Sequence, residues 1–422
     1  MKKYFSLIKQ FKKDLRLFYL ATAMQGFIFF GIYSLLLNLY LLRLGYGPKF
    51  IGTVNGVAPL VLAVGSLPAG LLSRRIGSRK GLIIGYFGIA IGFGLLPLSG
   101  FLLTDPAIQE AWIVGSYALA WLFAALLIVN YGPFIMEQTA EDERNHAFAI
   151  QSALFPVAGF VGSLAGGLLP GFFAQIANTT LDFPLPYRNA LLLAAALYLI
   201  PTFIITRTAE LNRKETDSNE QIKSRTKAPI RLMVIIAFIS LLLVTGDWTI
   251  QLYLNVYLDT VLKVPTALIG SLLGAGRLLG LTAFLSPIVM GRFGHKKTLL
   301  WASIVSSLTF LPLILIGHWV AAGVSFMALI AVASILNPTY NRFSQSIVEP
   351  EWRTTIASVM SMSTGIAIAI TAFEGSMLIT RFGYQTLFIT GALLMLLGGI
   401  VFGLVFREKE QPLKGMVTAA TD

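Results

Sequence analysis

The sequence contains no cysteine among its 422 residues, and only 12% of the residues are charged. Without cysteine, disulfides and thiolate-bound metals are excluded. The three histidines, His146, His295 and His318, lie far apart along the chain. Because metal ligands cluster at short or helical spacings, the sequence predicts no metal site and no cofactor. The charged fraction is about half that of a soluble domain, which indicates that water is not the main solvent.

Sequence motifs of membrane enzymes and ATP-driven pumps are also missing. No hydrophobic segment carries Gly-x-Ser-x-Gly, His-Glu-x-x-His or a close pair of carboxylates, and the chain has no phosphate-binding loop. These motifs supply a nucleophile, a metal-activated water or a nucleotide site. We therefore expect a protein that is not an enzyme and does not use ATP.

Long hydrophobic runs dominate the sequence, whose mean hydropathy is +0.75. A helix needs about 20 apolar residues to cross a bilayer, so such runs can be counted directly. The run Thr298–Asn341 is too long for one crossing, and Gly317-His318-Trp319 supplies a turn within it. Counting that run twice predicts twelve transmembrane helices. The predicted segments are Leu17–Leu42, Phe50–Ser73, Gly81–Thr104, Ala111–Met136, Ala147–Leu181, Asn189–Thr206, Leu232–Leu258, Val264–Gly291, Thr298–Asn341 as two helices, Thr354–Thr380 and Phe382–Phe406.

The basic residues predict the orientation. An even number of helices places both termini on one side, and 25 of the 32 lysines and arginines lie in segments on that side, against five on the other. Cytoplasmic loops of membrane proteins carry such an excess. We predict a multi-pass protein of the cytoplasmic (inner) membrane with both termini in the cytoplasm. The net charge of +12 is then a topology signal, so nucleic acid is not an expected partner.

The two ends and the middle of the chain are the polar segments. Residues 1–16 interleave Phe5, Ile8 and Phe11 with lysines, as expected for an interfacial helix on anionic lipid, and no cleavage site follows them. The predicted organisation is an interfacial segment (1–16), a six-helix bundle (17–206), a cytoplasmic linker (207–231), a second six-helix bundle (232–406) and a cytoplasmic tail (407–422).

The two predicted bundles share an internal repeat at an offset of 217 residues. Asn38-Leu-Tyr40 returns as Asn255-Val-Tyr257. More specifically, Arg75-Ile-Gly77-Ser-Arg79-Lys80 after the second segment returns as Arg292-Phe-Gly294-His-Lys296-Lys297 after the eighth. Repeats of this kind build transporters whose halves are related by a pseudo-two-fold axis.

With these features the chain resembles the major facilitator superfamily along nearly its whole length. The family's loop signature after the second helix, Gly-x-x-x-Asp-Arg-x-Gly-Arg-Arg/Lys, is matched by the segment that begins at Gly70, although Arg74 stands where the family has Asp. The resemblance implies an all-α membrane fold and transport by alternating access. It also implies a conformational role for the loop residues Gly70, Arg74, Arg75, Gly77, Arg79, Lys80, Arg292, Gly294, Lys296 and Lys297. The alternative role of these residues is to set the topology.

The fifth segment carries glycines at three- and four-residue spacing, including Gly162, Gly166 and Gly167. It is similar to the antiporter motif of the drug-exporting branch, Gly-Pro-x-x-Gly-Gly, with Ser163 in place of the proline. Plain helix packing is the alternative explanation.

Three ionisable residues lie within predicted membrane segments: Asp247, Arg277 and Glu374. Such residues are costly in hydrocarbon and often mark a pathway. We expect Asp247 or Glu374 to carry the coupled proton, and Arg277 to tune that carboxylate or bind an anionic substrate group. A buried Asp247–Arg277 ion pair that fixes helix packing is the alternative. Gln251 and Asn255 follow Asp247 on one helix face, which predicts a wet surface.

Other polar residues in the predicted helices are weaker candidates for substrate binding. A lone asparagine or glutamine is often a hydrogen-bonding link between helices. This group comprises Gln25, Asn38, Asn130, Asn337 and Asn341.

Together these features predict a monomeric secondary transporter in the lipid bilayer that moves a small molecule, with protons as the coupling ion. Many apolar and aromatic side chains favour efflux of an amphipathic or hydrophobic compound. The alternative is proton-coupled uptake of a polar metabolite such as a sugar or organic anion. A membrane scaffold or sensor is a more remote alternative, because it has no need of charge inside the membrane.

Overall fold

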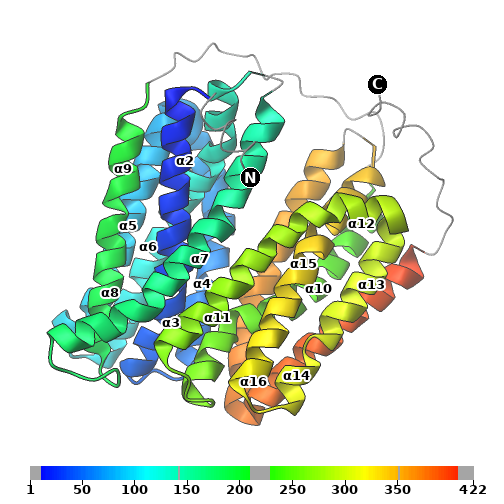
Figure 1. Ribbon diagram of the computed structural model, residues 1–422. Coiled ribbons are helices and arrows are strands. Elements are labelled where there is room, and N and C mark those ends of the chain that lie inside the picture. Colours follow the sequence, from blue (N-terminus) through cyan, green and yellow to red (C-terminus); the bar gives the residue numbers. More distant parts are fainter. Residues whose placement is uncertain (1–10, 141–142, 210–228, 350–351, 407–422) are drawn as a thin grey trace.

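The computed structural model describes residues 11–140, 143–209, 229–349 and 352–406. Within these ranges the regular secondary structure is entirely helical, and eleven continuous helical stretches are long and apolar enough to cross a membrane. They form two bundles, one from each half of the chain (Figure 1). The all-α membrane fold expected from the sequence is confirmed. Most of the predicted interfacial segment, linker and tail lies outside the described residues.

The N-terminal bundle contains six membrane-spanning segments. The first combines three helical pieces and the last combines two. The segments are α2 (Lys13–Gln25), η1 (Gly26–Tyr33) and α3 (Ser34–Arg43); α4 (Pro48–Ile76); α5 (Ser78–Leu102); α6 (Pro106–Gln138); α7 (Arg144–Ile176); and α8 (Pro184–Leu197) with α9 (Leu199–Thr206).

The C-terminal bundle repeats this pattern. Its segments are α10 (Ile230–Thr260); α11 (Thr266–Leu279), η2 (Gly280–Leu285) and α12 (Ser286–Phe293); α13 (His295–Leu308) with α14 (Leu311–Leu315); α15 (Trp319–Ser346); and α16 (Arg353–Val405). The predicted turn at Gly317-His318-Trp319 is confirmed, since His318 accepts a hydrogen bond from the backbone of Val320 and caps α15.

Helix α16 contains two spans. Its 53 residues would extend about 80 Å if straight, far more than one bilayer requires. Gly383 interrupts it with φ 82° and ψ 174°, close to the values of Gly77 (85°, 160°) and Gly294 (76°, 162°). Those two glycines end α4 and α12 and separate consecutive spans. Counted with this break, the described residues contain the twelve predicted helices.

The three glycines that separate consecutive spans share a sequence pattern. Each glycine follows an arginine by two residues, as in Arg75-Ile-Gly77, Arg292-Phe-Gly294 and Arg381-Phe-Gly383. A positive φ is easily adopted by glycine, which explains why the same residue occurs at all three breaks. Only the first two links continue with basic residues, so a search for charged loops detects those two alone.

The predicted end of the fifth helix is wrong by five residues. The fifth apolar run was expected to continue to Leu181, but α7 ends at Ile176 and Asn178 adopts a positive φ of 49°. Asparagine tolerates this left-handed conformation better than most residues, so it ends the helix although the run stays uncharged to Leu181. A count of charge-free residues does not register such a backbone turn.

Glycines allow the helices of the N-terminal bundle to approach backbone to backbone. A Cβ atom on Gly31 would lie 2.3 Å from the Cα of Gly162, and one on Gly162 would lie 2.1 Å from the carbonyl oxygen of Phe27. Close contacts of small residues are a principal source of helix association in membranes, where water supplies no driving force. The glycine ladder of α7 is thus a packing face against η1.

We predict that Gly162→Leu disrupts the N-terminal bundle, because the side chain has no space between α7 and η1. The expected loss in the free energy of unfolding exceeds about 2 kcal/mol. Thermal unfolding in detergent measures it. Gly115→Leu on α6 is the matched control, since nothing lies within 4 Å of a Cβ at that position. Equal melting temperatures for the two variants would contradict the packing role.

Candidate functional site

The two bundles meet at one end of the molecule. We call this end the distal side; it contains the loops at residues 44–47, 177–183 and 261–265. We call the opposite end the terminal side; it contains the first residue of α2 and the last residue of α9. Figure 1 shows the bundles converging at the distal side and diverging toward the terminal side. Across the interface α4 packs on α16, and α7 packs on α11.

Two asparagines related by the internal repeat bond to each other across the interface. Asn38 of α3 donates from Nδ2 to Oδ1 of Asn255 on α10 at 3.2 Å, and Asn255 donates to the carbonyl of Leu35 at 3.2 Å. Asn38 also accepts a hydrogen bond from Asn55 of α4 at 2.9 Å. Because the partners are separated by the repeat offset of 217, the pseudo-two-fold axis passes between them. Both predicted site residues are therefore contacts between bundles in this structure.

An ion pair closes the distal end beyond the asparagines. Arg43, at the end of α3, contacts both carboxylate oxygens of Asp259 at 2.7 Å. The guanidinium also donates to the carbonyl of Leu181 at 2.8 Å and lies over the ring of Tyr187. Tyr187 in turn shares a hydrogen bond of 3.1 Å with Thr266 of the other bundle. We call Arg43, Asp259, Tyr187 and Thr266 the distal latch.

The sequence prediction missed the distal latch, because Arg43 counted only as a charge in an outer loop. Arg43 and Asp259 are separated by 216 residues, close to the repeat offset of 217, and this opposite charge at equivalent helix ends is a signal that could have found them. Two-point contact between a guanidinium and a carboxylate is the strong form of this interaction. The latch thus joins the bundles through charge as well as packing.

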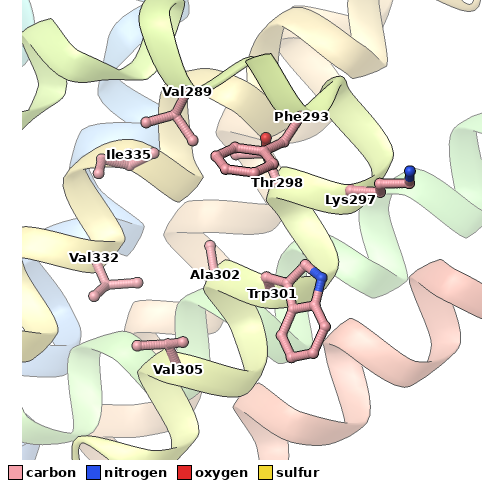
Figure 2. A pocket seen from close by; sticks show the side chains of 9 residues that line it. All are labelled: Val289, Phe293, Lys297, Thr298, Trp301, Ala302, Val305, Val332 and Ile335. Carbon is pink, nitrogen blue, oxygen red and sulfur yellow. The ribbon is translucent and has the colours of Figure 1, made fainter. Parts of the chain in front are cut away.

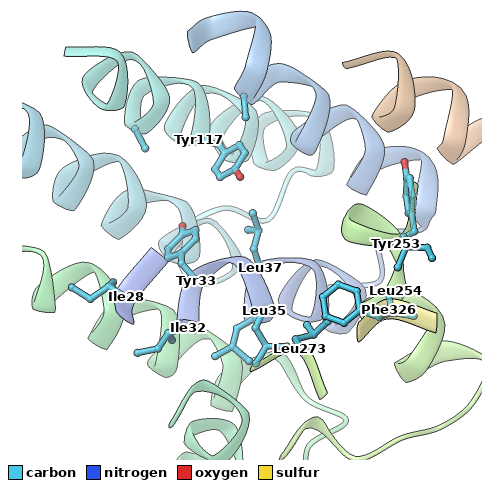
Figure 3. Close-up of a cluster of buried hydrophobic side chains, with 14 of the residues drawn as sticks. Ile28, Ile32, Tyr33, Leu35, Leu37, Tyr117, Tyr253, Leu254, Leu273 and Phe326 are labelled. Carbon is cyan, nitrogen blue, oxygen red and sulfur yellow. The ribbon is translucent and has the colours of Figure 1, made fainter. Parts of the chain in front are cut away.

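Apolar and small residues seal the same half of the interface. A Cβ on Gly52 of α4 would lie 2.3 Å from the carbonyl of Ala372 on α16, and one on Gly270 of α11 would lie 2.5 Å from that of Ser163 on α7. The hydrophobic cluster shown in Figure 3 includes Leu35 from one bundle and Leu273 from the other. Nothing larger than glycine fits at these contacts without displacement, so the distal half is tightly closed.

Asp247 lies at the middle of α10 and is 6% exposed. Its Oδ2 accepts a hydrogen bond from Gln251 at 3.0 Å, and its Oδ1 is buried without a partner among the described residues. Gln251, one turn further along, is exposed. The predicted common face of these two residues is present. It places a buried carboxylate next to an accessible amide.

Arg277 of α11 reaches across to the N-terminal bundle. Its Nη2 donates to Ser34 Oγ at 2.9 Å, and its guanidinium lies 5.6 Å from the ring centre of Phe30. Its Nη1 is buried and has no partner among the described residues. The neighbouring backbone is irregular, since η1 is a π-helix and η2, which follows α11, is a 3-10 helix.

The three predicted intramembrane charges do not form one cluster. None of Asp247, Arg277 and Glu374 makes an ion pair with a described residue, so the alternative of a buried Asp247–Arg277 pair is wrong for this conformation. Glu374 is exposed and shares its face of α16 with Ile370 and Met377, which are also exposed. The structure therefore separates Glu374 from the interface that α16 forms with α4.

Helix α15 presents a polar face in its terminal half. Asn337, Asn341 and Gln345 follow one another at four-residue spacing and are all exposed, as is Arg342. Polar groups at this depth are costly in lipid, which favours a water-filled space as their surroundings. Gln251 of α10 is a further exposed polar residue in a span of the C-terminal bundle.

Two predicted candidates bond only within the N-terminal bundle. Gln25 accepts hydrogen bonds from Tyr86 and Tyr131, and so connects α2, α5 and α6. Asn130 is fully buried, accepts a hydrogen bond from Ser73 and lies where a Cβ on Gly81 would be. Their contacts fit links between helices, the alternative role for a lone amide.

The predicted loop residues lie at the terminal ends of the helices. Gly77 and Gly294 form matching caps, and Arg79 donates to the carbonyl of Thr206 at the end of α9 at 2.7 Å. A cation at a helix C-terminus is favoured by the helix dipole. Ser78 adds a hydrogen bond of 2.5 Å to Glu137 on α6. The remaining predicted loop residues are Gly70, Arg74, Arg75, Lys80, Arg292, Lys296 and Lys297.

A groove of about 450 Å³ lies between α12, α13 and α15 (Figure 2). Its walls are almost entirely apolar, and Lys297 is the charged residue on its rim. Phe293 and Trp301 line it and are more than half exposed. Because this surface belongs to one bundle and contains none of Asp247, Gln251 and Arg277, we distinguish it from the candidate site.

Three solved structures with the same fold are distant from this chain in sequence. The nucleoside transporter NupG matches with a TM-score of 0.73 at 14% identity, covering 94% of this chain and 100% of that one. The xylose transporter XylE from E. coli, in an inward open conformation, gives 0.70 at 14% identity, with coverages of 94% and 97%. A bacterial homolog of the human lysosomal transporter Spinster gives 0.69 at 14%, with 93% and 96%.

Curated proteins gave no match to this sequence. A family model matches residues 18–372, most of both bundles. This match agrees with the twelve helices, the repeated halves and the interface described above. The chain belongs to the Major Facilitator Superfamily.

Proposed function

We propose that the protein is a secondary transporter that moves a small solute by alternating access, and that this conformation is the one open to the cytoplasm. The observation that carries the proposal is the distal latch, which joins the bundles at one end while they diverge toward the other (Figure 1). The terminal side is the cytoplasmic one because most lysines and arginines lie there.

The repeated halves explain how the opposite state could form. Each half of the repeat forms a bundle of its own, so rotation of one bundle against the other opens the distal side without unfolding either bundle. The distal latch must break in that motion. Its ion pair, rather than the contacts within each bundle, then sets the balance between the two states.

We assign proton coupling to Asp247 rather than Glu374. Asp247 is buried beside the accessible Gln251 and near the interface, so a change in hydration there would alter its protonation. Glu374 is exposed on a face that it shares with apolar side chains. Its protonation is not expected to follow the opening and closing of the interface.

Exposed polar residues in the spans of the C-terminal bundle indicate which kind of solute the protein moves. Gln251, Asn337 and Asn341 offer hydrogen-bonding groups that a purely hydrophobic compound cannot use. This favours uptake of a polar metabolite, the second of the two functions predicted from the sequence, over efflux of a hydrophobic one. Two of the proteins with the same fold are described as transporters of nucleosides and of xylose, which is consistent with a polar solute.

Distances between spin labels test alternating access directly. The chain has no cysteine, so labels can be placed at the exposed positions Arg207 and Ser346 on the terminal side, and at Lys49 and Lys263 on the distal side. We predict that Asp259→Asn lengthens the distal distance and shortens the terminal one. Loss of about 1–2 kcal/mol from the latch changes the ratio of states about five- to thirtyfold.

Two further variants complete this experiment. Arg43→Gln should give the same shift as Asp259→Asn, because it removes the other half of the ion pair. Arg188→Gln is the matched control, since Arg188 also lies near the distal end but stacks on Phe101 of its own bundle. If the two distances never change in opposite directions, the bundles do not rock and the proposed mechanism fails.

We predict that Asp247→Asn uncouples transport from the proton gradient. Solute exchange between the two sides should continue, while accumulation driven by a pH gradient should fall to background, because the amide cannot carry the proton. The measurement uses proteoliposomes and a labelled solute identified by thermal-shift screening of sugars, amino acids, carboxylates and drugs. Glu374→Gln is the control and should keep gradient-driven accumulation; loss of accumulation in that variant alone would move the assignment to Glu374.

A further inference from the structure

Arg277 is a cation at the middle of the membrane without a protein anion to neutralise it. No carboxylate among the described residues pairs with it, and its Nη1 is buried without a hydrogen-bond partner. Phe30 and Ser34 face the guanidinium but carry no formal charge. Intramembrane arginines normally pair with acidic groups or lie in water, so this arrangement is incomplete.

The position of Arg277 is where the two bundles touch at mid-depth. The residue belongs to α11, yet its contacts are Phe30 and Ser34 of the first span and Gly159 of α7. A Cβ on Gly159 would lie 3.6 Å from Nη1, an ordinary van der Waals contact. The side of the guanidinium with the unused donor therefore faces α7 at a residue that has no side chain.

The backbone around Arg277 departs from regular α-helix on both sides of the interface. The first span forms the π-helix Gly26–Tyr33, which ends next to Ser34. The eighth span changes to a 3-10 helix at Gly280, three residues after Arg277. π-Helical turns and 3-10 stretches inside longer helices occur frequently at functional sites. Two such departures beside one unpaired cation are independent observations that point to the same place.

We propose that Arg277 and Ser34 form the subsite that binds an anionic group of the transported solute, a carboxylate or a phosphate. The proposal rests on the transport function proposed above and names its substrate class as organic anions. Nη1 supplies the unused donor, while Nη2 stays bonded to the hydroxyl of Ser34. A planar guanidinium matches the oxygens of a carboxylate and of a phosphate. The negative charge of either anion would neutralise Arg277, which no described carboxylate does.

Contacts to both bundles give this subsite a way to influence the conformation. Arg277 moves with the C-terminal bundle, whereas Ser34 and Phe30 move with the N-terminal bundle. An anion held between them would bind one state better than the other. Only such differential binding lets a ligand shift an equilibrium between states. The solute would then drive the rearrangement through the same residue that recognises its charge.

Matched pairs of compounds test the proposal. The full-length protein in detergent is screened by thermal shift against carboxylates and phosphate monoesters, each beside its neutral amide or alcohol. We expect at least one anion to raise the melting temperature and its neutral counterpart to have no effect. Titration of that anion into Arg277→Gln should show affinity at least about tenfold weaker, as expected for loss of a charge-assisted hydrogen bond.

Further variants show what a packing role would do instead. Ser34→Ala removes one hydroxyl and should lower the affinity for the same anion. Arg277→Lys should bind the anion more tightly than Arg277→Gln does, because the charge is retained. Arg188→Gln should bind it within about twofold of the unmodified protein, because Arg188 stacks on Phe101 of its own bundle and lies outside the subsite. Carboxylates and phosphates are titrated separately, so the preferred anion is identified. A chain that is stabilised equally by neutral and anionic members of each pair, or by anions regardless of Arg277, would overturn the proposal.

The spin-label distances separate this test from that of transport. Distal and terminal distances that change in opposite directions in Asp259→Asn, together with no preference for anions, would leave alternating access in place and refute the anion subsite alone. Distances that never change would refute the transport mechanism, whatever Arg277 binds.

Discussion

The cost of placing an ionised side chain in hydrocarbon governs this structure. Each charge at membrane depth must be paired, hydrated or neutralised by a bound group. Arg43 and Asp259 meet the condition by pairing with each other across the bundles. Arg277 does not meet it with any described carboxylate. The same physical rule therefore explains the contact at the distal side and motivates the proposal that Arg277 binds an anion.

The internal repeat places equivalent residues of the two halves in contact with each other. Asn38 and Asn255 occupy equivalent positions in the two halves, and their hydrogen bond lies at the axis about which the halves are related. Arg43 and Asp259 lie nearer the distal ends of α3 and α10 than the asparagines do, so opening of that side separates the ion pair further. The ion pair thus fits a latch, while Asn38 and Asn255 bond to each other across the bundles, although the sequence suggested ligand contact for both.

The fold followed from hydrophobic runs and glycine positions, but the site followed only in part. Run lengths of about 20 residues give the twelve helices, because hydrocarbon thickness fixes them. The same rule missed the end of α7 at Ile176, where the backbone turns within an uncharged stretch. Asp247 and Arg277 stood out because charge is rare inside a span. Their lack of pairing depended on how α10 and α11 are rotated relative to each other, which sequence periodicity does not determine.

Glu374 shows that the position of a carboxylate within a span does not reveal its surroundings in the folded protein. Its place in α16 predicted a role equal to that of Asp247, yet it lies on a face with exposed Ile370 and Met377 rather than at the interface with α4. A carboxylate takes part in alternating access only if its surroundings change between the states. Asp247 adjoins the accessible Gln251, and Arg277 contacts both bundles. Binding of an anion at Arg277 and protonation of Asp247 would then both depend on the interface that the latch controls.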